Sequence, residues 1–157
     1  MGAGKTTVGQ ELAALMDREL VDMDAELVRR HGATIGTIFA QRGEERFREW
    51  EGALALELAM RQNIVVATGG GSLVDDKVFE QLGVYGFFVY LEWPFEVLWE
   101  RIEQTGRYRP LVERGRNEML RLFRKREPRY RQSHLTVRCD RLPANFIAKV
   151  VRHAFTI

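Results

Sequence analysis

Hydrophobic positions along the chain follow two alternating patterns. Short runs rich in β-branched and aromatic residues occur at 64–67 and 87–91. Longer stretches place apolar residues at helical spacing, as Val8, Leu12 and Leu15 do. Short strands that alternate with amphipathic helices are typical of a parallel sheet covered by helices. The pattern therefore predicts a layered α/β structure.

The same pattern predicts the order of the elements. Strands are expected at residues 19–22, 64–68, 87–92 and 135–140. Helices are expected at 5–16, 25–30, 37–41, 44–61, 76–82, 95–104, 116–131 and 143–155. Polar residues between 105 and 115 predict a loop. Since no linker or repeat interrupts this order, we expect residues 1–157 to form a single domain.

Composition excludes several classes of protein. With 45% hydrophobic and 29% charged residues among 157, the chain is typical of a globular domain. Its longest apolar runs are far shorter than the roughly 20 residues that a membrane helix needs, so we expect no membrane partner. The single cysteine, Cys139, has no partner for an internal disulfide and is expected to be buried in a strand. These features, with no secretory signal, favour a cytoplasmic protein.

Positive charge is concentrated in one segment. Residues 101–131 hold ten arginines and one lysine against four glutamates, whereas the whole chain has a net charge of only +2. The planar guanidinium matches phosphates and carboxylates, so an anionic ligand is expected, with a solvated helix face as the alternative. A nucleic-acid-binding module is a remote alternative, because the segment lacks the interleaved aromatic residues of a stacking surface.

The start of the chain matches the downstream part of a phosphate-binding loop. That match covers Gly2, Ala3, Gly4, Lys5, Thr6 and Thr7. Glycines let backbone N–H groups converge on phosphate oxygens, and the following helix adds positive potential. Lys5 is expected to reach the terminal phosphates, and the Thr6 hydroxyl to hold Mg²⁺. The motif thus predicts ATP as a co-substrate with Mg²⁺ as cofactor.

The complete loop pattern contains another glycine five positions before Gly4, which would precede Met1. A strand that normally leads into such a loop would precede it too, and would lie in the middle of the sheet. We therefore expect the natural chain to begin further upstream. The alternative is a genuine short form in which nucleotide binding is impaired.

Further motifs follow the predicted strands. Asp22 and Asp24 come after the first strand, residues 43–51 open the long helix, and Gly69-Gly70-Gly71 ends the second strand. Arg109-Pro110-Leu111 lies in the late loop, and Arg126-Glu127-Pro128-Arg129-Tyr130 follows it.

Taken alone, each motif has an ordinary explanation. The paired carboxylates could be solvated, with Asp24 capping the next helix. Arg48 could simply pair with Glu44, four residues earlier on the same helix, and Arg126 could pair on the surface. The triple glycine could be a simple turn, and Arg109 an exposed loop residue.

In this order and at these spacings, the motifs resemble the shikimate kinase family across essentially the whole chain. The resemblance implies a P-loop NTPase-type three-layer α/β/α fold with a parallel central sheet. It also implies a substrate-binding helical segment at about 24–61 and a lid at about 104–116. The implied reaction is transfer of the γ-phosphoryl of ATP to the 3-hydroxyl of shikimate, giving shikimate 3-phosphate. In this family Met1 would be an internal methionine of the loop.

The resemblance also assigns roles to the reacting end of the site. Lys5 and Arg109 would stabilise the transferring phosphoryl group, with Arg109 carried by the lid. Asp24 would hydrogen-bond and activate the acceptor hydroxyl. Asp22 would act in the outer coordination sphere of the Mg²⁺ that Thr6 binds.

The remaining roles concern the ligands. Arg48 and Arg126 would bind the shikimate carboxylate, and the backbone of Gly69, Gly70 and Gly71 would lie against the ring, closest at Gly70. Arg101 and Arg141 would contact the nucleotide, although both could be plain surface residues. A monomer is expected. A kinase of another small acceptor, such as gluconate or a nucleoside monophosphate, is the main alternative, and an inactive anion-binding module a remote one.

Overall fold

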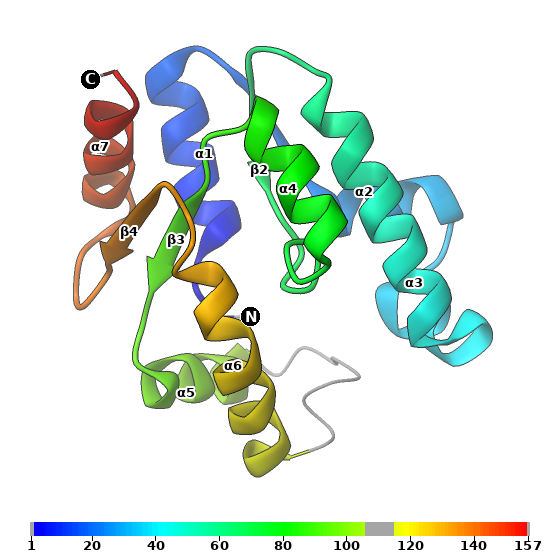
Figure 1. Ribbon diagram of the computed structural model, residues 1–157. Helices are drawn as coiled ribbons and strands as arrows, with labels where there is room; N and C mark the ends of the chain where they lie inside the picture. Colours follow the sequence, from blue (N-terminus) through cyan, green and yellow to red (C-terminus); the bar gives the residue numbers. More distant parts are fainter. Residues whose placement is uncertain (1, 106–114, 157) are drawn as a thin grey trace.

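The computed structural model describes residues 2–105 and 115–156. Figure 1 shows the order of the elements. The strands are β1 (Glu19–Asp22), β2 (Ile64–Ala67), β3 (Val89–Glu92) and β4 (Leu135–Arg138). The helices are α1 (Lys5–Met16), α2 (Met23–His31), α3 (Ile35–Ala59), α4 (Asp76–Tyr85), α5 (Phe95–Thr105), α6 (Arg116–Tyr130) and α7 (Ala144–Phe155). The predicted elements are present with ends shifted by a few residues, except that two predicted helices join into α3.

The strands pair in parallel, as predicted, but in two separate sheets. β1 pairs with β2, and β3 pairs with β4. Each parallel pair needs a helical crossover, which α2 and α3 supply for the first pair and α5 and α6 for the second. The predicted α/β arrangement of parallel strands with flanking helices is therefore confirmed, although the described residues form two parallel pairs. A further strand was expected in the middle of the sheet, and the described residues provide none between β2 and β3.

Alternating side chains place helices on both faces of the β1–β2 sheet. Leu20 and Val65 are register partners that point toward α1, where a Cβ added to Gly9 would lie 2.9 Å from Leu20 Cδ1 and 3.9 Å from Val65 Cγ1. The next partners, Val21 and Val66, point the other way, into the cluster built by α3 and α4. Because successive strand residues face opposite sides, the sheet lies between two helical layers.

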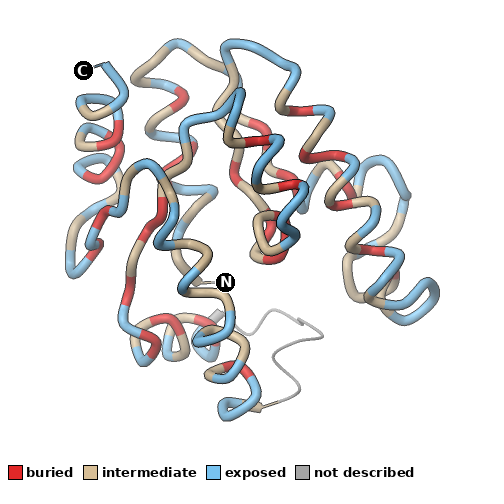
Figure 2. Tube along the Cα trace, in the orientation of Figure 1, coloured by how far each residue is buried: buried red, intermediate tan, exposed pale blue. Residues whose placement is uncertain are grey.

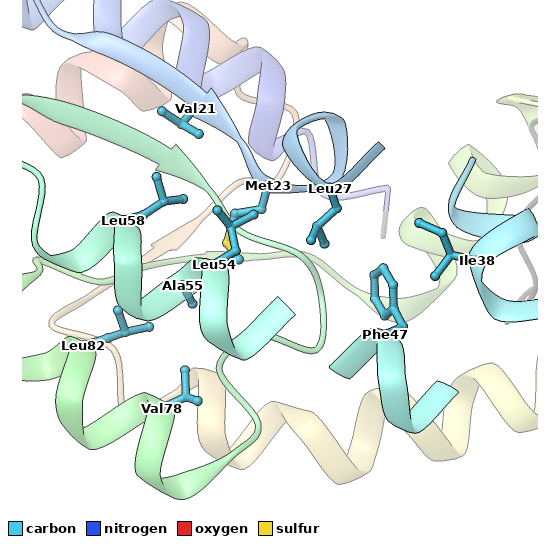
Figure 3. Close-up of a cluster of buried hydrophobic side chains, with 10 residues drawn as sticks. All are labelled: Val21, Met23, Leu27, Ile38, Phe47, Leu54, Ala55, Leu58, Val78 and Leu82. Carbon is cyan, nitrogen blue, oxygen red and sulfur yellow. The ribbon is translucent and has the colours of Figure 1, made fainter. Parts of the chain in front are cut away.

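Two buried clusters form the core, one beside each sheet. Figure 3 shows the first cluster, whose members are Val21, Met23, Leu27, Ile38, Phe47, Leu54, Ala55, Leu58, Val78 and Leu82. The second, around β3 and β4, consists of Val8, Leu91, Trp93, Leu98, Val137, Cys139, Ile147 and Val151. Figure 2 shows buried positions on the strands and on the inward faces of the helices. Since α1 packs on β1 and β2 and also contributes Val8 to the second cluster, it connects the two halves.

Short polar side chains determine where several helices begin. The carboxylate of Asp22 accepts a hydrogen bond from the Ala25 N–H at 3.2 Å and caps α2. Asp75 caps α4 in the same way through the Val78 N–H. Such side chains satisfy backbone donors that have no partner inside the helix. As a result, α2 starts immediately at the carboxyl end of β1.

A single glycine interrupts α3. Gly43 has φ 80° and ψ 167°, which is not a helical conformation. Residues with a side chain essentially never adopt this backbone region. The helices predicted at 37–41 and 44–61 are therefore the two halves of α3, joined across Gly43.

Among the helices of the described residues, none combines the length and apolar character that crossing a membrane requires.

The thiol of Cys139 is expected to be unreactive in the folded chain. The side chain is 0% exposed, which confirms the prediction that it is buried, and burial raises its pKa to about 11. At pH 8 the thiol is therefore protonated and out of reach of reagents, and thiolates are the reactive form. Labelling of the Cys139 thiol by a disulfide-exchange reagent, monitored by absorbance, should be slow for the native chain and complete in guanidinium. Rapid stoichiometric labelling of the native chain would contradict this placement.

Acid should weaken the ion pairs that Glu26 forms within α2. Hydrogen bonds from Arg29 and then Arg30 lower the pKa of Glu26 to about 2, from an ordinary value of 4.5. Arg30 also pairs with Glu57 of α3 at 2.6 Å. Because the folded-state pKa is the lower one, this stabilisation is complete above about pH 4.5 and is lost as pH falls toward 2.

The variant Glu26→Gln tests this dependence. Its melting temperature should lie below that of the parent at pH 7, and the gap should narrow at pH 3. Glu45→Gln, at an exposed position of α3, is the matched control. A gap that is equal at both pH values would count against the role of Glu26.

Candidate active site

The predicted functional residues gather where the strands end. The loop that begins α1 lies beside the carboxyl end of β1, which carries Asp22, and the glycine segment follows β2. In sheets of this kind, ligands bind outside the carboxyl ends of the strands. The order of elements thus brings the predicted phosphate and acceptor residues to one edge of the molecule.

The two predicted metal residues are in direct contact. Thr6 Oγ1 donates a hydrogen bond of 2.6 Å to Asp22 Oδ2, while Asp22 Oδ1 caps α2. Both side chains present oxygen atoms, which are the ligands that Mg²⁺ prefers. Over residues 2–105 and 115–156 there is no group of three or more His, Cys, Asp or Glu side chains that could hold a metal. Mg²⁺ at this point would therefore need oxygens from a ligand, as it does in phosphate-bound sites.

Asp24 lies in the first turn of α2 and is exposed. The alternative that Asp24 caps this helix is wrong, because Asp22 provides the cap. Asp24 is thus a solvent-accessible carboxylate two residues from the Thr6–Asp22 contact.

Arg48 is held by a buried carboxylate. Its guanidinium donates to Glu51 Oε2 at 2.6 Å and to Glu44 Oε1 at 3.3 Å. The Glu51 side chain is only 2% exposed, whereas that of Arg48 is 27% exposed. The pairing with Glu44 considered from sequence is present, but the shorter contact with Glu51 determines the orientation of Arg48. Part of the guanidinium remains accessible to a ligand.

The triple glycine packs against this ion pair. A Cβ added to Gly69 would collide with Glu51 Oε1, and one added to Gly71 would collide with the Arg48 guanidinium. At Gly70 the nearest atom, Arg126 Nη1, would be 3.6 Å away, an ordinary contact. The protein itself therefore requires glycine at 69 and 71, while any requirement at Gly70 must come from a ligand.

Two side chains of α6 hold the Gly70 carbonyl. Tyr130 donates its hydroxyl to Gly70 O at 2.5 Å, and Arg126 Nη1 donates at 3.0 Å. Burial raises the pKa of the Tyr130 phenol, so it remains a donor at neutral pH. Arg126 is therefore placed beside the glycine segment and on the same side of the site as Arg48.

The other predicted residues differ in how far the structure describes them. Lys5 begins α1 and is half-buried beside the glycine segment. The Arg101 guanidinium stacks on Trp93, 3.7 Å from the ring centroid, and donates to Gly2 O at 3.5 Å. Arg141 is exposed, with φ 60°, between β4 and α7. Arg109 lies outside the described residues, as does most of the predicted lid.

Sequence reasoning missed Glu51 and Tyr130 as site residues. Glu51 is in the helix motif, three residues after Arg48, and the only signal for its burial is the apolar pattern that continues through Leu54. Tyr130 contacts Gly70 across sixty positions of sequence, which no local pattern can reveal.

A cavity of about 120 Å³ lies between β3, α5, α6 and the segment that follows β2, next to these residues. Its walls come from β3, α5 and α6 and are mainly apolar, including Val89, Leu91, Phe95, Leu98, Ile102, Met119, Leu122 and Phe123. Lys5, Gly70 and Arg126 also line it. Since apolar walls do not suit anions, we place the chemistry at the polar lining residues Lys5 and Arg126 rather than at the apolar walls.

A glycine-containing loop at the start of α1, beside the carboxyl end of β1, together with two oriented arginines, is the arrangement expected of a P-loop kinase of a small anionic acceptor. A model of the family described as "Shikimate kinase" matches residues 1–155. The shikimate kinase of Pseudoalteromonas translucida is 40% identical over 155 residues, which cover 96% of this chain and 90% of that protein. The chain belongs to the shikimate kinase family.

Solved structures agree with this family and with the α/β P-loop kinase fold. The structure of the Acinetobacter baumannii shikimate kinase in complex with shikimate matches with a TM-score of 0.92 and 38% identity, over 99% of this chain and 88% of that one. A gluconokinase from Sinorhizobium meliloti matches with a TM-score of 0.59 and 22% identity, over 99% and 85% of the two chains. The second likeness concerns the fold alone.

Neighbouring glycines should differ in their tolerance of a methyl group. Gly69→Ala places a Cβ on the buried Glu51 carboxylate and should destabilise the chain by about 1–3 kcal/mol, the usual cost of overpacking. Gly70→Ala, whose Cβ would make only an ordinary contact with Arg126 Nη1 at 3.6 Å, is the matched control and should melt close to the parent. Calorimetric or circular-dichroism melting of the three chains gives the comparison. Equal losses in both variants would contradict the packing described here.

Proposed function

We propose that this chain transfers the γ-phosphoryl group of ATP to the 3-hydroxyl of shikimate. The observation that supports the proposal most strongly is the oriented Arg48, paired with buried Glu51 at the edge where the Thr6–Asp22 contact also lies. One side of the site suits a carboxylate and the other suits phosphates. Membership of the shikimate kinase family supports the same acceptor.

The phosphate side uses backbone and charge. The N–H groups around Gly4 and at the start of α1 would bind phosphate oxygens, and the Lys5 ammonium would contact the terminal phosphates. Thr6 and Asp22 would hold Mg²⁺, which when bound neutralises phosphate charge. Phosphoryl transfer of this kind depends mainly on positioning and electrostatic stabilisation.

The acceptor side would use two arginines and one carboxylate. Arg48 and Arg126 would bind the carboxylate of shikimate, and the chain at Gly70 would lie against the ring. Asp24 would accept a hydrogen bond from the attacking hydroxyl and direct its oxygen toward the γ-phosphorus. Anchoring the substrate at a distant carboxylate fixes the hydroxyl in an attacking position.

Three further arginines complete the proposal. Arg109 would close over the transferring phosphoryl group and offset its developing charge. Arg101 and Arg141 would contact the nucleotide. All three roles are carried over from the family resemblance.

The acceptor can be tested directly by a coupled assay of ADP release with ATP, Mg²⁺ and a panel of acceptors. We expect turnover with shikimate and none with gluconate or nucleoside monophosphates. Gluconate is the informative rival because it also carries a carboxylate and differs from shikimate in lacking the ring. Turnover with gluconate alone would overturn the proposed acceptor and leave the kinase class intact.

Arg48→Lys should weaken shikimate binding selectively. Lysine keeps the positive charge beside Glu51 but loses the planar fork that binds a carboxylate with two hydrogen bonds. We expect the KM for shikimate to rise about 10- to 100-fold, which corresponds to roughly 1.5–3 kcal/mol for hydrogen bonds to a charged group. The KM for ATP should stay within a factor of two, and both constants come from the same assay.

The matched control is Arg46→Lys, on the same helix but 58% exposed and paired with Glu49. It should leave both KM values unchanged. A melting curve of each variant separates substrate effects from unfolding, because a poorly paired Glu51 would itself be destabilising. Equal rises in both KM values for Arg48→Lys would argue against a role in acceptor binding.

A further inference from the structure

Trp93 directly follows β3 and is nearly buried, with 5% of its surface exposed. Its indole N–H donates a hydrogen bond of 3.1 Å to the carbonyl oxygen of Ala3, ninety positions away in the phosphate-binding loop. The contact thus connects the carboxyl end of a strand to the loop that would bind ATP. We propose that Trp93 is a positioning residue, which orients the Ala3–Gly4 peptide for phosphate binding.

The geometry of a trans peptide explains how this contact would act. In a planar trans peptide the C=O and the next N–H point in opposite directions. Because Trp93 holds the Ala3 carbonyl, the Gly4 N–H of the same peptide points away from the indole. Gly4 has φ 78° and is the N-cap of α1, so its N–H belongs to the group of donors that an anion meets at a helix start.

Gly2, which precedes Ala3, is held by residues of α5 close to Trp93. A Cβ added to Gly2 would lie 3.0 Å from the Leu98 carbonyl of α5, so the backbone of the loop approaches that helix closely. Arg101, one turn further along α5, covers the indole of Trp93 and donates to Gly2 O. Gly2 and Ala3 are therefore held from outside by α5 and Trp93, respectively.

Packing alone does not require tryptophan here. The ring fills a cluster with Leu91, Leu98 and Val137, and a phenylalanine would also supply an apolar ring. A buried indole N–H needs an acceptor, and the acceptor it has is a loop carbonyl whose orientation matters for the phosphate site. The indole N–H of Trp93 thus binds the backbone of the loop.

The variant Trp93→Phe removes the donor and keeps a ring in the cluster. We expect its KM for ATP to rise about 5- to 50-fold, the loss expected when a buried carbonyl loses its donor. The KM for shikimate should change by less than a factor of two. Trp99→Phe, on α5 and stacked on Phe95, is the matched control and should leave both values unchanged.

Calorimetric binding of inorganic tripolyphosphate separates this role from an effect on Arg101. Tripolyphosphate has the phosphates without the adenine, so its affinity should fall by the same factor as that of ATP. Loss of ATP affinity alone would place the effect at the base and overturn the proposal, as would unchanged ATP affinity. A melting curve must accompany each variant, because equal rises in both KM values together with lower stability would indicate a merely structural role.

This inference rests on the ATP-binding part of the proposed function and is independent of the acceptor. If the parent turns over shikimate but Trp93→Phe keeps its ATP affinity, only the inference about Trp93 fails. If the parent binds ATP and Trp93→Phe loses affinity but no acceptor reacts, only the proposed function fails. Absence of ATP and tripolyphosphate binding in the parent would overturn both.

Discussion

The nearly buried carboxylate of Glu51 constrains the whole acceptor side of the site. An ionised group removed from water costs several kcal/mol unless a partner and further hydrogen bonds compensate for it. Arg48 supplies the compensating charge, at 2.6 Å. The segment after β2 can approach this pair only because Gly69 and Gly71 have no side chains. One buried charge therefore determines the orientation of an arginine, the composition of a loop and the distance between α3 and that loop.

The phosphate side depends on a different set of elements. Its contacts come from α1, β1 and the residue after β3, whereas the acceptor contacts come from α3 and α6. Lys5, Gly70 and Arg126 line one cavity, so the two sides meet there. If each ligand is bound by its own elements, as proposed, the affinity for ATP can change without a change in the affinity for the acceptor.

The sequence predicted those features that depend on local pattern. Periodicity located the strands and helices, the loop motif identified Lys5 and Thr6, and the family resemblance added Asp22 at the same Mg²⁺ site. Tertiary contacts account for what it missed. The Tyr130 and Trp93 contacts span sixty and ninety positions, and the burial of Glu51 depends on how α3 packs. For the same reason, the sequence did not show that Gly69 and Gly71 are crowded by the side chains of α3, while the expected approach of a ligand to Gly70 stays a prediction. The division into two sheets likewise depends on pairing between distant strands, which periodicity does not encode.

Gly43 illustrates a constraint of another kind. It is exposed, and a methyl group at its Cα would meet no atom within 4 Å, yet its backbone conformation is open to glycine alone. We therefore expect Gly43 to tolerate substitution as poorly as a buried residue does, although it is exposed. Every amino-acid replacement that a single base change can produce from a glycine codon adds a side chain, so any such mutation would force the bend in α3 to change. The angle between the two halves of α3 thus depends on the glycine at position 43, although no atom would contact a Cβ added there.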